Sequence, residues 1–368
     1  MKKTILLTTL VITQTILAST LTIYNSNIAY VSETRDLYIK KDTSKIVYDE
    51  IPSNIIQDSV DVDFPNSIDL YEQTYDKKDL SLIYKVDTKK DIDTKVKLNY
   101  LTSGISFKND YILNITKDGA KLKAFSSIKN YSGKDFKDVD VSLVAGDINR
   151  ASNRYPVLYK SVGTSRDNDV KRVATNGYHI YDISYKLDIN NDEEKRVKLF
   201  DIANLVIENE YVANLNNPLY LYGERSSAVS RHIRFNTSDK IFPKGVVRVY
   251  DTSEDKSLFL GEDTIANSTL NTDVDIKVGK DFDTKVVQSV VSREDTKTHL
   301  VSEIKYSVQN HSLTPKTITL EIPFDKTRSS VVYSKIEYNL TKANILRFVV
   351  NVDASSKKDF TVKFESKR

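Results

Sequence analysis

Four of the aspartate pairs that stand two residues apart are the clearest candidates for chemistry in this sequence. The pairs are Asp61 with Asp63, Asp138 with Asp140, Asp273 with Asp275, and Asp281 with Asp283. Residues two apart on a β-strand point to one face, so each pair would hold two carboxylates together. Such carboxylates bind calcium, or act as acid and base in glycoside hydrolysis. The alternative is a solvated role, in which alternating aspartates form the solvent-exposed face of a half-buried strand. None of these pairs opens a calcium-binding hand loop, so we favour that solvated role.

The remaining residue types exclude several classes of enzyme. The four histidines form no metal-chelating motif, and we interpret each as a surface or structural residue; they are His179, His232, His299 and His311. No Gly-x-Ser-x-Gly elbow is present, and no two glycines are two residues apart, which excludes phosphate and dinucleotide loops. Cysteine is absent, so thiolate chemistry, disulfides and cysteine metal sites are excluded as well. We expect no metal and no cofactor.

The elements that would position these side chains are strands. Apolar and polar residues alternate in 139–143, 183–189, 274–278 and 318–322, and this period of two is typical of strands with one wet face. Turn residues separate such segments at short intervals, as in sandwich folds. We therefore predict an all-β chain: a small N-terminal β-domain followed by two antiparallel β-sandwich domains. The best candidates for short helices are 53–59 and 202–206.

One short echo within the chain indicates two related β-domains. Asn130-Tyr-Ser132 and Asn310-His-Ser312 each lie between two strand-like segments, and such Asn and Ser side chains satisfy backbone groups in turns. Chance similarity between hairpins explains the echo equally well. A break is expected near 214–225, where Asn, Pro and Gly cluster. The predicted division is a signal peptide at 1–18, the small domain at 19–95, and sandwiches at 96–215 and 216–368.

The N-terminus predicts export. Lys2 and Lys3 precede an apolar stretch that ends at the small residues Ala18 and Ser19, which is the pattern of a secretory signal peptide. The alternative is a retained anchor, but the stretch is shorter than the roughly 20 apolar residues of a membrane span. We expect a periplasmic or cell-surface protein with no membrane span after cleavage. The formal net charge of +3 argues against a nucleic-acid binder.

Several segments, in this order, resemble one family of exported bacterial proteins. They include Leu98-Asn-Tyr-Leu-Thr-Ser-Gly-Ile105, Asn130-Tyr-Ser-Gly-Lys-Asp-Phe136, Pro243-Lys-Gly-Val-Val-Arg-Val-Tyr250 and Leu260-Gly-Glu262. The chain resembles the mucoidy inhibitor A-like proteins, whose main domain has no established function. The resemblance implies stacked β-sandwiches and an envelope location, and it implies no reaction. Many members carry a coiled-coil insertion after the first domain, whereas 80–93 here shows no heptads.

The most specific part of this resemblance gives the candidate site. Its residues are a structural motif or a partner-binding site, and they are Pro243, Gly245, Arg248, Tyr250, Gly261 and Glu262. Pro243 before Lys244-Gly245 predicts a turn in which Gly245 is able to take a positive φ. Gly261 predicts a bulge or a close backbone contact. Arg248 and Glu262 are expected to pair across neighbouring strands.

We interpret the chain as a non-enzymatic envelope protein that binds an envelope protein or a glycan through strand edges or loops. The alternative is a carboxylate-dependent hydrolase acting on surface polysaccharide, which should gather acids or histidines from distant segments in a concave pocket. A third interpretation, a surface-layer or adhesion component, predicts self-assembly. The 22 tyrosines leave open a tyrosine-lined groove, and the polar segment 161–176 predicts a long exposed loop. No oligomeric state follows from the sequence.

Overall fold

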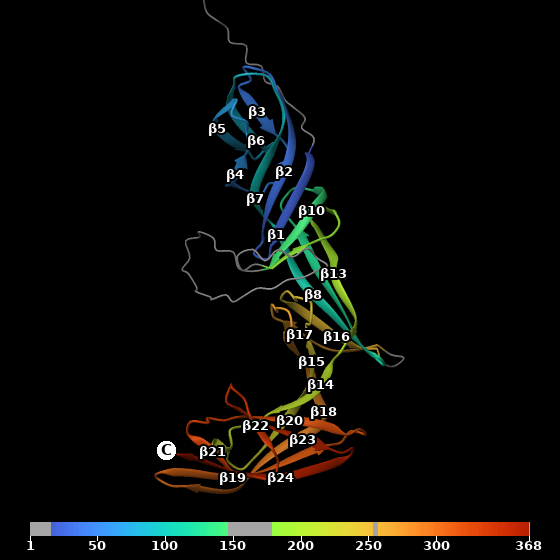
Figure 1. Cartoon of the computed structure of the whole chain (residues 1–368), viewed down its shortest axis with the longest axis vertical. Coiled ribbons are helices and arrows are strands. Elements are labelled where there is room, and N and C mark those ends of the chain that lie inside the picture. The colour runs from blue at the N-terminus through green and yellow to red at the C-terminus, as the bar shows by residue number, and fades with distance from the viewer. Residues whose placement is uncertain (1–15, 146–178, 253–256, 368) are drawn as a thin grey trace, which may run out of the picture.

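The chain forms an elongated all-β molecule (Figure 1). The structure is a computed structural model, and it describes residues 16–145, 179–252 and 257–367. About 70% of these residues lie in strands and 1% in helix, which confirms the predicted all-β fold class. Within this described part, no helix is long and apolar enough to cross a membrane.

Strands β1 to β13 form what we call the N-terminal unit. Their bounds are β1 (Ile16–Tyr24), β2 (Ile28–Ile39), β3 (Lys45–Tyr48), β4 (Ile55–Val62), β5 (Ile68–Asp76), β6 (Ser81–Thr88), β7 (Ile92–Ser103), β8 (Ile105–Thr116), β9 (Gly119–Asn130), β10 (Phe136–Ala145), β11 (His179–Asp182), β12 (Leu187–Ile189) and β13 (Glu193–Leu205). One sheet has the order β11-β10-β1-β2-β7-β4, with β12 also paired to β10. A second sheet contains β13-β9-β8, and β3-β6-β5 form a small third sheet.

The rest of the chain forms the C-terminal unit. Its elements are β14 (Glu208–Asn214), the short 3₁₀ turn η1 (Pro218–Tyr220), β15 (Glu224–Asn236), β16 (Gly245–Asp251), β17 (Leu258–Ile265), β18 (Asp273–Asp295), β19 (His299–Asn310), β20 (Lys316–Pro323), β21 (Ser329–Ser334), β22 (Tyr338–Leu340), β23 (Ile345–Val352) and β24 (Ser356–Lys367). A nine-stranded sheet has the order β21-β24-β19-β18-β15-β14-β20-β23-β22. Its edge strands β21 and β22 are consecutive in the chain, so the sheet curls round its core.

The two units share one strand order. In the N-terminal unit it is β12-β10-β1-β2-β7, continued by β8-β9-β13, and Gly104 alone separates β7 from β8. In the C-terminal unit it is β23-β20-β14-β15-β18-β19-β24, and the unbroken β18 replaces β7 and β8. Both units contain a parallel pair at the same place, β1 with β10 and β14 with β20. The other neighbours in these two orders are antiparallel.

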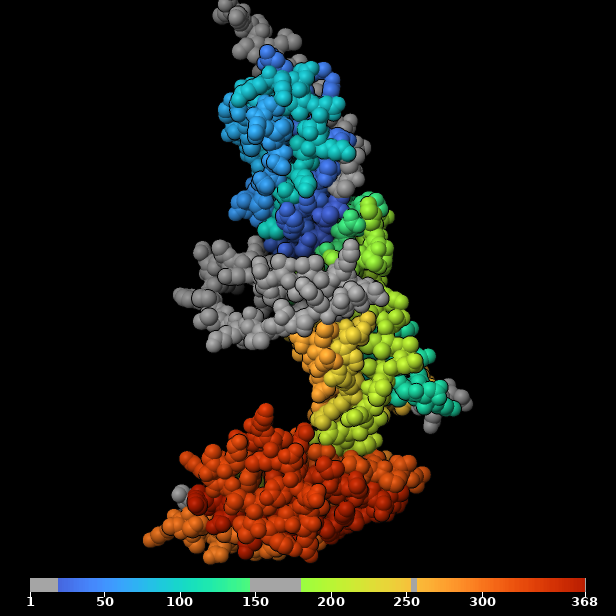
Figure 2. All heavy atoms as spheres, viewed as in Figure 1, coloured from blue at the N-terminus to red at the C-terminus, as the bar shows by residue number. Residues whose placement is uncertain are grey.

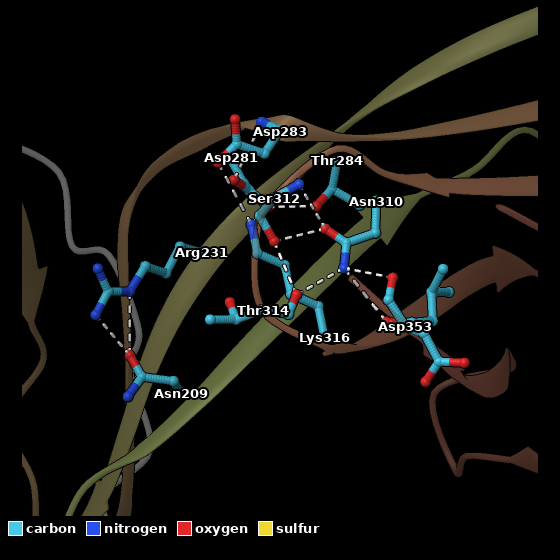
Figure 3. A network of polar contacts seen from close by, with 11 residues as sticks. Asn209, Arg231, Asp281, Asp283, Thr284, Asn310, Ser312, Thr314, Lys316 and Asp353 are labelled. Atoms are coloured by element: carbon cyan, nitrogen blue, oxygen red, sulfur yellow. Dashed lines mark hydrogen bonds and ion pairs between the residues drawn. The ribbon is translucent and has the colours of Figure 1, made fainter. Parts of the chain in front are cut away.

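The echo noted in the sequence marks equivalent turns in the two units. The Nδ2 atom of Asn310 donates to the carbonyl of Thr314 at 2.8 Å, while its Oδ1 atom accepts from the N–H and hydroxyl of Ser312 (Figure 3). Asn130 makes the same bonds, with Lys134 and Ser132 as its partners. Both asparagines are fully buried.

Backbone hydrogen bonds next to the two turns also correspond between the units. Tyr131 N–H donates to the Gly104 carbonyl at 2.7 Å, and His311 N–H donates to the Asp283 carbonyl at 2.8 Å. Asn130 and Asn310 also donate to the last carbonyls of β12 and β23, respectively. The two units are therefore two copies of one sandwich, and chance similarity between hairpins does not explain the echo.

The copies differ in what is inserted between their second and third strands. In the N-terminal unit the insertion contains β3 to β6, and β3, β5 and β6 form a sheet that packs on the unit's own core. In the C-terminal unit it contains β16 and β17. Strand β16 pairs in parallel with β8 of the other unit, from Gly245 opposite Asn109 to Asp251 opposite Ile115. This pairing creates a middle layer between the units, seen in yellow and orange in Figure 1.

Three hydrophobic cores follow the long axis. The first fills the N-terminal sandwich, and the third fills the curled nine-stranded sheet. The middle core lies between the far ends of β8 and β9 and the near ends of β15 and β18, with Phe242 at its centre. Long strands thus run from one core into the next and join the units.

The predicted short helices were wrong. Residues 53–59 overlap β4, because Ile55 and Ile56 pair with Thr102 and Leu101 of β7. Residues 202–205 continue β13, which pairs with β9. Sheet pairing outweighed weak local helical signals at both places. Within 183–189, only Leu187–Ile189 is a strand.

The sheets do not follow the predicted domain limits. Strand β7 runs across residue 95, and β14, which precedes residue 215, belongs to the nine-stranded sheet. The predicted break near 214–225 is a loop that joins two neighbouring strands, β14 and β15.

Candidate functional site

An open groove lies where the middle layer meets the C-terminal sandwich. Its volume is about 910 Å³, within the range of small-ligand sites. The walls come from the end of β13 and the start of β14 at 201–208, the end of β15 with the loop after it at 234–240, the start of β18 at 273–275, and Arg347 of β23. Figure 2 shows that the molecule narrows between the yellow middle layer and the red C-terminal part.

Charged side chains from three strands meet beside this groove, and two of them, Arg234 and Asp275, line it. Asp275 of β18 accepts from Nε and Nη2 of Arg234 at 3.1 and 3.0 Å, and its other oxygen lies 2.7 Å from Nδ1 of His232. Arg234 also forms an ion pair with Glu210 of β14, which stands opposite His232 in the sheet. The pairing of β14, β15 and β18 thus gathers residues that are far apart in the sequence.

These contacts fix the ionisation of Asp275. Burial by itself would raise the pKa of this carboxyl, but the hydrogen bonds and charges of His232 and Arg234 outweigh burial, so the pKa falls below its ordinary value. Asp281 follows the same pattern, with Lys316 and Thr284 as partners (Figure 3). Both aspartates are therefore ionised at neutral pH.

A second charged cluster is sealed inside the N-terminal unit. Glu33 and Arg35 of β2 are 0% and 2% exposed. The Glu33 carboxylate accepts from Nε of Arg35 at 3.0 Å and from the Tyr100 hydroxyl at 2.9 Å, and it forms an ion pair with Lys134. Burial opposes ionisation of Glu33, but the two cations hold its pKa below the ordinary value. Sequence reasoning missed this cluster, although Glu33 and Arg35 share a strand face with Val31 and Leu37.

Three residues of the predicted motif hold the middle layer together. The carbonyl of Pro243 accepts a hydrogen bond from the buried Tyr111 hydroxyl of β8. A Cβ at Gly245 would lie 2.5 Å from the Asn109 carbonyl oxygen, so glycine permits the parallel pairing with β8. Gly245 does not use the positive φ that glycine allows; close approach of the backbones requires glycine there. Gly261 has φ +151, and a Cβ would meet the Val278 carbonyl at 2.0 Å, so the predicted close contact is confirmed.

The other three residues of the motif lie at the surface. Arg248 faces Glu262 across β16 and β17, with Nε 3.2 Å from Oε2, which confirms the predicted pair. Their side chains are about half exposed. The Tyr250 ring packs on Phe259 with centroids 5.4 Å apart, next to the bulge between Val249 and Tyr250. This surface lies apart from the groove, whose lining includes none of the six motif residues.

The aspartate pairs do not gather into a metal centre. Asp138 pairs with Lys186, Asp273 accepts from Asn236, and Asp281 pairs with Lys316. In residues 16–145, 179–252 and 257–367, no three His, Asp or Glu side chains are placed to hold a metal ion.

The remaining predicted features are dispersed. His299 lies 3.7 Å from Glu365, and the backbone of His311 joins the turn after β19, while His179 lies in β11. The predicted loop at 161–176 lies outside the described residues. Tyrosine is absent from the lining found for the groove.

A scan of the chain against models of known protein families found no match, and a search of curated proteins found no relative.

Proposed function

We propose that this chain is an exported, non-enzymatic envelope protein that binds a partner in the groove beside Arg234 and Asp275. The observation that carries this proposal is the charge state of the groove wall. Acids from distant segments line the groove and His232 lies beside Asp275, as a hydrolase would require, but Asp275 is held ionised by Arg234 and His232. An acid catalyst in glycoside hydrolysis needs a raised pKa.

The rest of the described chain agrees with binding rather than hydrolysis. Every carboxyl group there with a clear pKa shift is shifted downward; these groups are Glu33, Glu72, Asp91, Glu193, Asp275, Asp281, Asp325 and Asp359. A preformed groove between two rigid layers is a common place for ligands to bind.

The decisive experiment compares two charge-reversal variants in a pull-down from the envelope fraction. The groove variant carries Glu208→Lys and Asp273→Lys, two exposed acids of the lining. The control carries Asp79→Lys and Asp87→Lys, two exposed acids of the N-terminal unit. The wild type and the control should capture the same partner, and the groove variant should not. Equal capture by both variants, or no partner for the wild type, would refute the proposal.

Export and kinship with the mucoidy inhibitor A-like proteins belong to the same proposal. They are supported by the basic and apolar N-terminus, by the motif segments and by the stacked sandwiches that the resemblance implies. Cleavage after Ala18 would also leave the whole ladder between β1 and β10 intact, because that ladder begins at Thr20. N-terminal sequencing of the protein from the envelope should find a start near Ser19. An intact Met1 would contradict signal cleavage.

A further inference from the structure

The equivalent turns after β9 and β19 differ in what lies against them. In the N-terminal unit, the loop before β4 covers the turn. Asn54 N–H donates to the Ser132 carbonyl at 3.1 Å, and Asn54 Nδ2 donates to the Tyr131 carbonyl at 2.7 Å. The contact is close, because a Cβ at Gly133 would lie 2.1 Å from the Ser53 hydroxyl oxygen. A large side chain at this position of the turn would therefore collide with the loop.

Two large apolar side chains stand at the corresponding places of the C-terminal unit, and we call Phe282 and Leu313 the apolar tip. The residue whose carbonyl accepts the first N–H of the turn is preceded by Ser103 in one unit and by Phe282 in the other. The third residue after the buried asparagine is Gly133 in one unit and Leu313 in the other. Phe282 is 93% exposed and Leu313 is 90% exposed. The sandwich therefore needs no apolar side chain at either place, since a serine and a glycine occupy them in the other copy.

Hydrogen bonds hold the two segments of the apolar tip together. His311 N–H donates to the Asp283 carbonyl at 2.8 Å, which joins the turn after β19 to the bulge in β18 that carries Phe282. Beside this bond, the side chains of Lys316 and Asp281 are almost fully buried, and Nζ lies 2.7 Å from Oδ2 (Figure 3). This ion pair neutralises the acid that precedes Phe282.

The turn that carries Leu313 satisfies its own polar groups. The N–H and hydroxyl of Ser312 donate to Oδ1 of Asn310, and Nδ2 of Asn310 donates to the Thr314 carbonyl. The Ser312 carbonyl accepts from Ser355 N–H at 3.0 Å. Unpaired backbone groups are costly in an apolar medium, so a turn with these internal bonds can enter such a medium at a lower cost.

The small area of the apolar tip favours a membrane over a protein partner. An aromatic side chain buries roughly 150–250 Å², so Phe282 and Leu313 together fall short of the roughly 800 Å² per partner of a standard protein interface. A bilayer needs no matching surface, because apolar side chains enter its interfacial region and bind in proportion to the area that they bury.

The exposed charges beside the tip are mixed, with lysines in the majority. Four exposed lysines lie on the segments that adjoin it: Lys280, Lys285, Lys357 and Lys358. Three exposed aspartates lie there too: Asp283, Asp353 and Asp359. Asp359 pairs with Lys357, and Asp283 lies 4.0 Å from Lys316. Lysine side chains extend to lipid phosphates, but their surplus is small, so apolar insertion supplies most of the binding.

We propose that the apolar tip inserts Phe282 and Leu313 into the interfacial region of a phospholipid bilayer, while the neighbouring lysines contact the headgroup phosphates. This contact attaches the C-terminal unit to a membrane surface. It goes beyond the proposed function, because the lining of the groove includes neither residue of the tip. Purified chain and synthetic vesicles suffice to test it, so the outcome depends neither on the groove nor on export.

The first test places a reporter in the tip. The chain contains no tryptophan, so Phe282→Trp introduces a single fluorophore of this kind. Its emission should shift to the blue when vesicles of equal parts phosphatidylcholine and phosphatidylglycerol are added, because the ring leaves water. Tyr71→Trp, at an exposed position of the N-terminal unit, should show no shift. No shift for Phe282→Trp, or the same shift for both variants, would overturn the inference.

The second test removes the tip. The double variant Phe282→Ser, Leu313→Ser should co-sediment with the same vesicles at least about tenfold more weakly than the wild type. The matched control is Leu70→Ser, Tyr71→Ser, which also removes an exposed leucine and an exposed aromatic ring and should bind like the wild type. Unchanged urea midpoints would show that both variants are folded.

Two outcomes of this second test would refute insertion. One is equal co-sedimentation of the wild type and the tip variant. The other is self-association of the wild type that the tip variant loses, without binding to vesicles, which would make the tip an interface between copies of this chain.

Discussion

The N-terminal and C-terminal units share one strand order but differ in how far their charged clusters are buried. In the first, Glu33 and Arg35 are sealed beneath β3 and neutralise each other with Lys134. In the second, His232 and Arg234 of β15 share Asp275, and Arg234 and Asp275 line an open groove. The units also differ in the path of one insertion, which folds onto its own unit in the first and crosses to β8 of the other unit in the second. A repeated scaffold thus carries a sealed charged cluster in one copy and an accessible one in the other.

The largest expected effect tests whether burial separates the two clusters. Glu33→Ala should cost about 3–5 kcal/mol, because it leaves Arg35 and Lys134 as buried cations without their carboxylate. Asp275→Ala should cost about 1 kcal/mol or less, since solvent screens a half-exposed pair. Urea unfolding followed by circular dichroism measures both losses, and hydrogen exchange assigns each to its unit. Equal losses would remove the distinction between a sealed and an open cluster.

The next effect tests the equivalence of the units. Asn130→Ala and Asn310→Ala each strip a buried turn of its side-chain donor and acceptor. Unpaired buried polar groups cost about 1–3 kcal/mol each, so each variant should lose about 2–4 kcal/mol. Hydrogen exchange should show faster opening in the mutated unit only. Losses that differ by more than about 1 kcal/mol would mean that the two turns contribute unequally to the free energy of unfolding.

A somewhat smaller effect tests the parallel pairing of β16 with β8, which joins the two units. Gly245→Ala should destabilise the middle core by about 1–3 kcal/mol, because the new Cβ meets the Asn109 carbonyl at 2.5 Å. Gly279→Ala is the matched control, since the nearest atom, the Leu260 carbonyl oxygen, lies 3.7 Å away. Exchange protection in β8 and β16 reports the outcome. If both variants keep wild-type protection, the parallel pairing does not depend on glycine.

The effect of acid tests the sealed cluster without removing it. The Glu33 pKa is lowered by folding, so its contribution to stability is complete above about pH 4.5, the ordinary value, and is lost as pH falls toward the folded pKa. Between pH 7 and pH 5.5 this carboxyl should change nothing. Below pH 4.5 the wild type should lose more stability to urea than Glu33→Gln does. Parallel losses in the two proteins would show that Glu33 does not titrate with unfolding.

The fold class and the repeat could be predicted from the sequence, but the contacts between the units could not. Alternation alone predicts strands such as β10 and β20, and Asn130 and Asn310 mark the shared turn. The crossing of β16 to β8 depends on the fit of Gly245 against Asn109, 136 positions away in the chain, and no local pattern shows such a fit. The groove is lined by segments between residues 201 and 347 that are far apart in the chain, so no local pattern shows it either. The sealed cluster did leave a signal, because charges at 33 and 35 interrupt an apolar strand face.

The smallest expected effect concerns Arg248, which lies on the surface of the middle layer and belongs to neither charged cluster. Arg248→Ala should cost about 0.2–1 kcal/mol, because an exposed cross-strand pair with Glu262 gains little over its hydrated side chains. Lys129→Ala, which removes a similar exposed pair with Glu194, is the matched control. In 1 M salt, where charges are screened beyond about 3 Å, both costs should shrink. Loss of the cellular phenotype by Arg248→Ala at unchanged stability, with Lys129→Ala unaffected, would instead make this surface a second binding site.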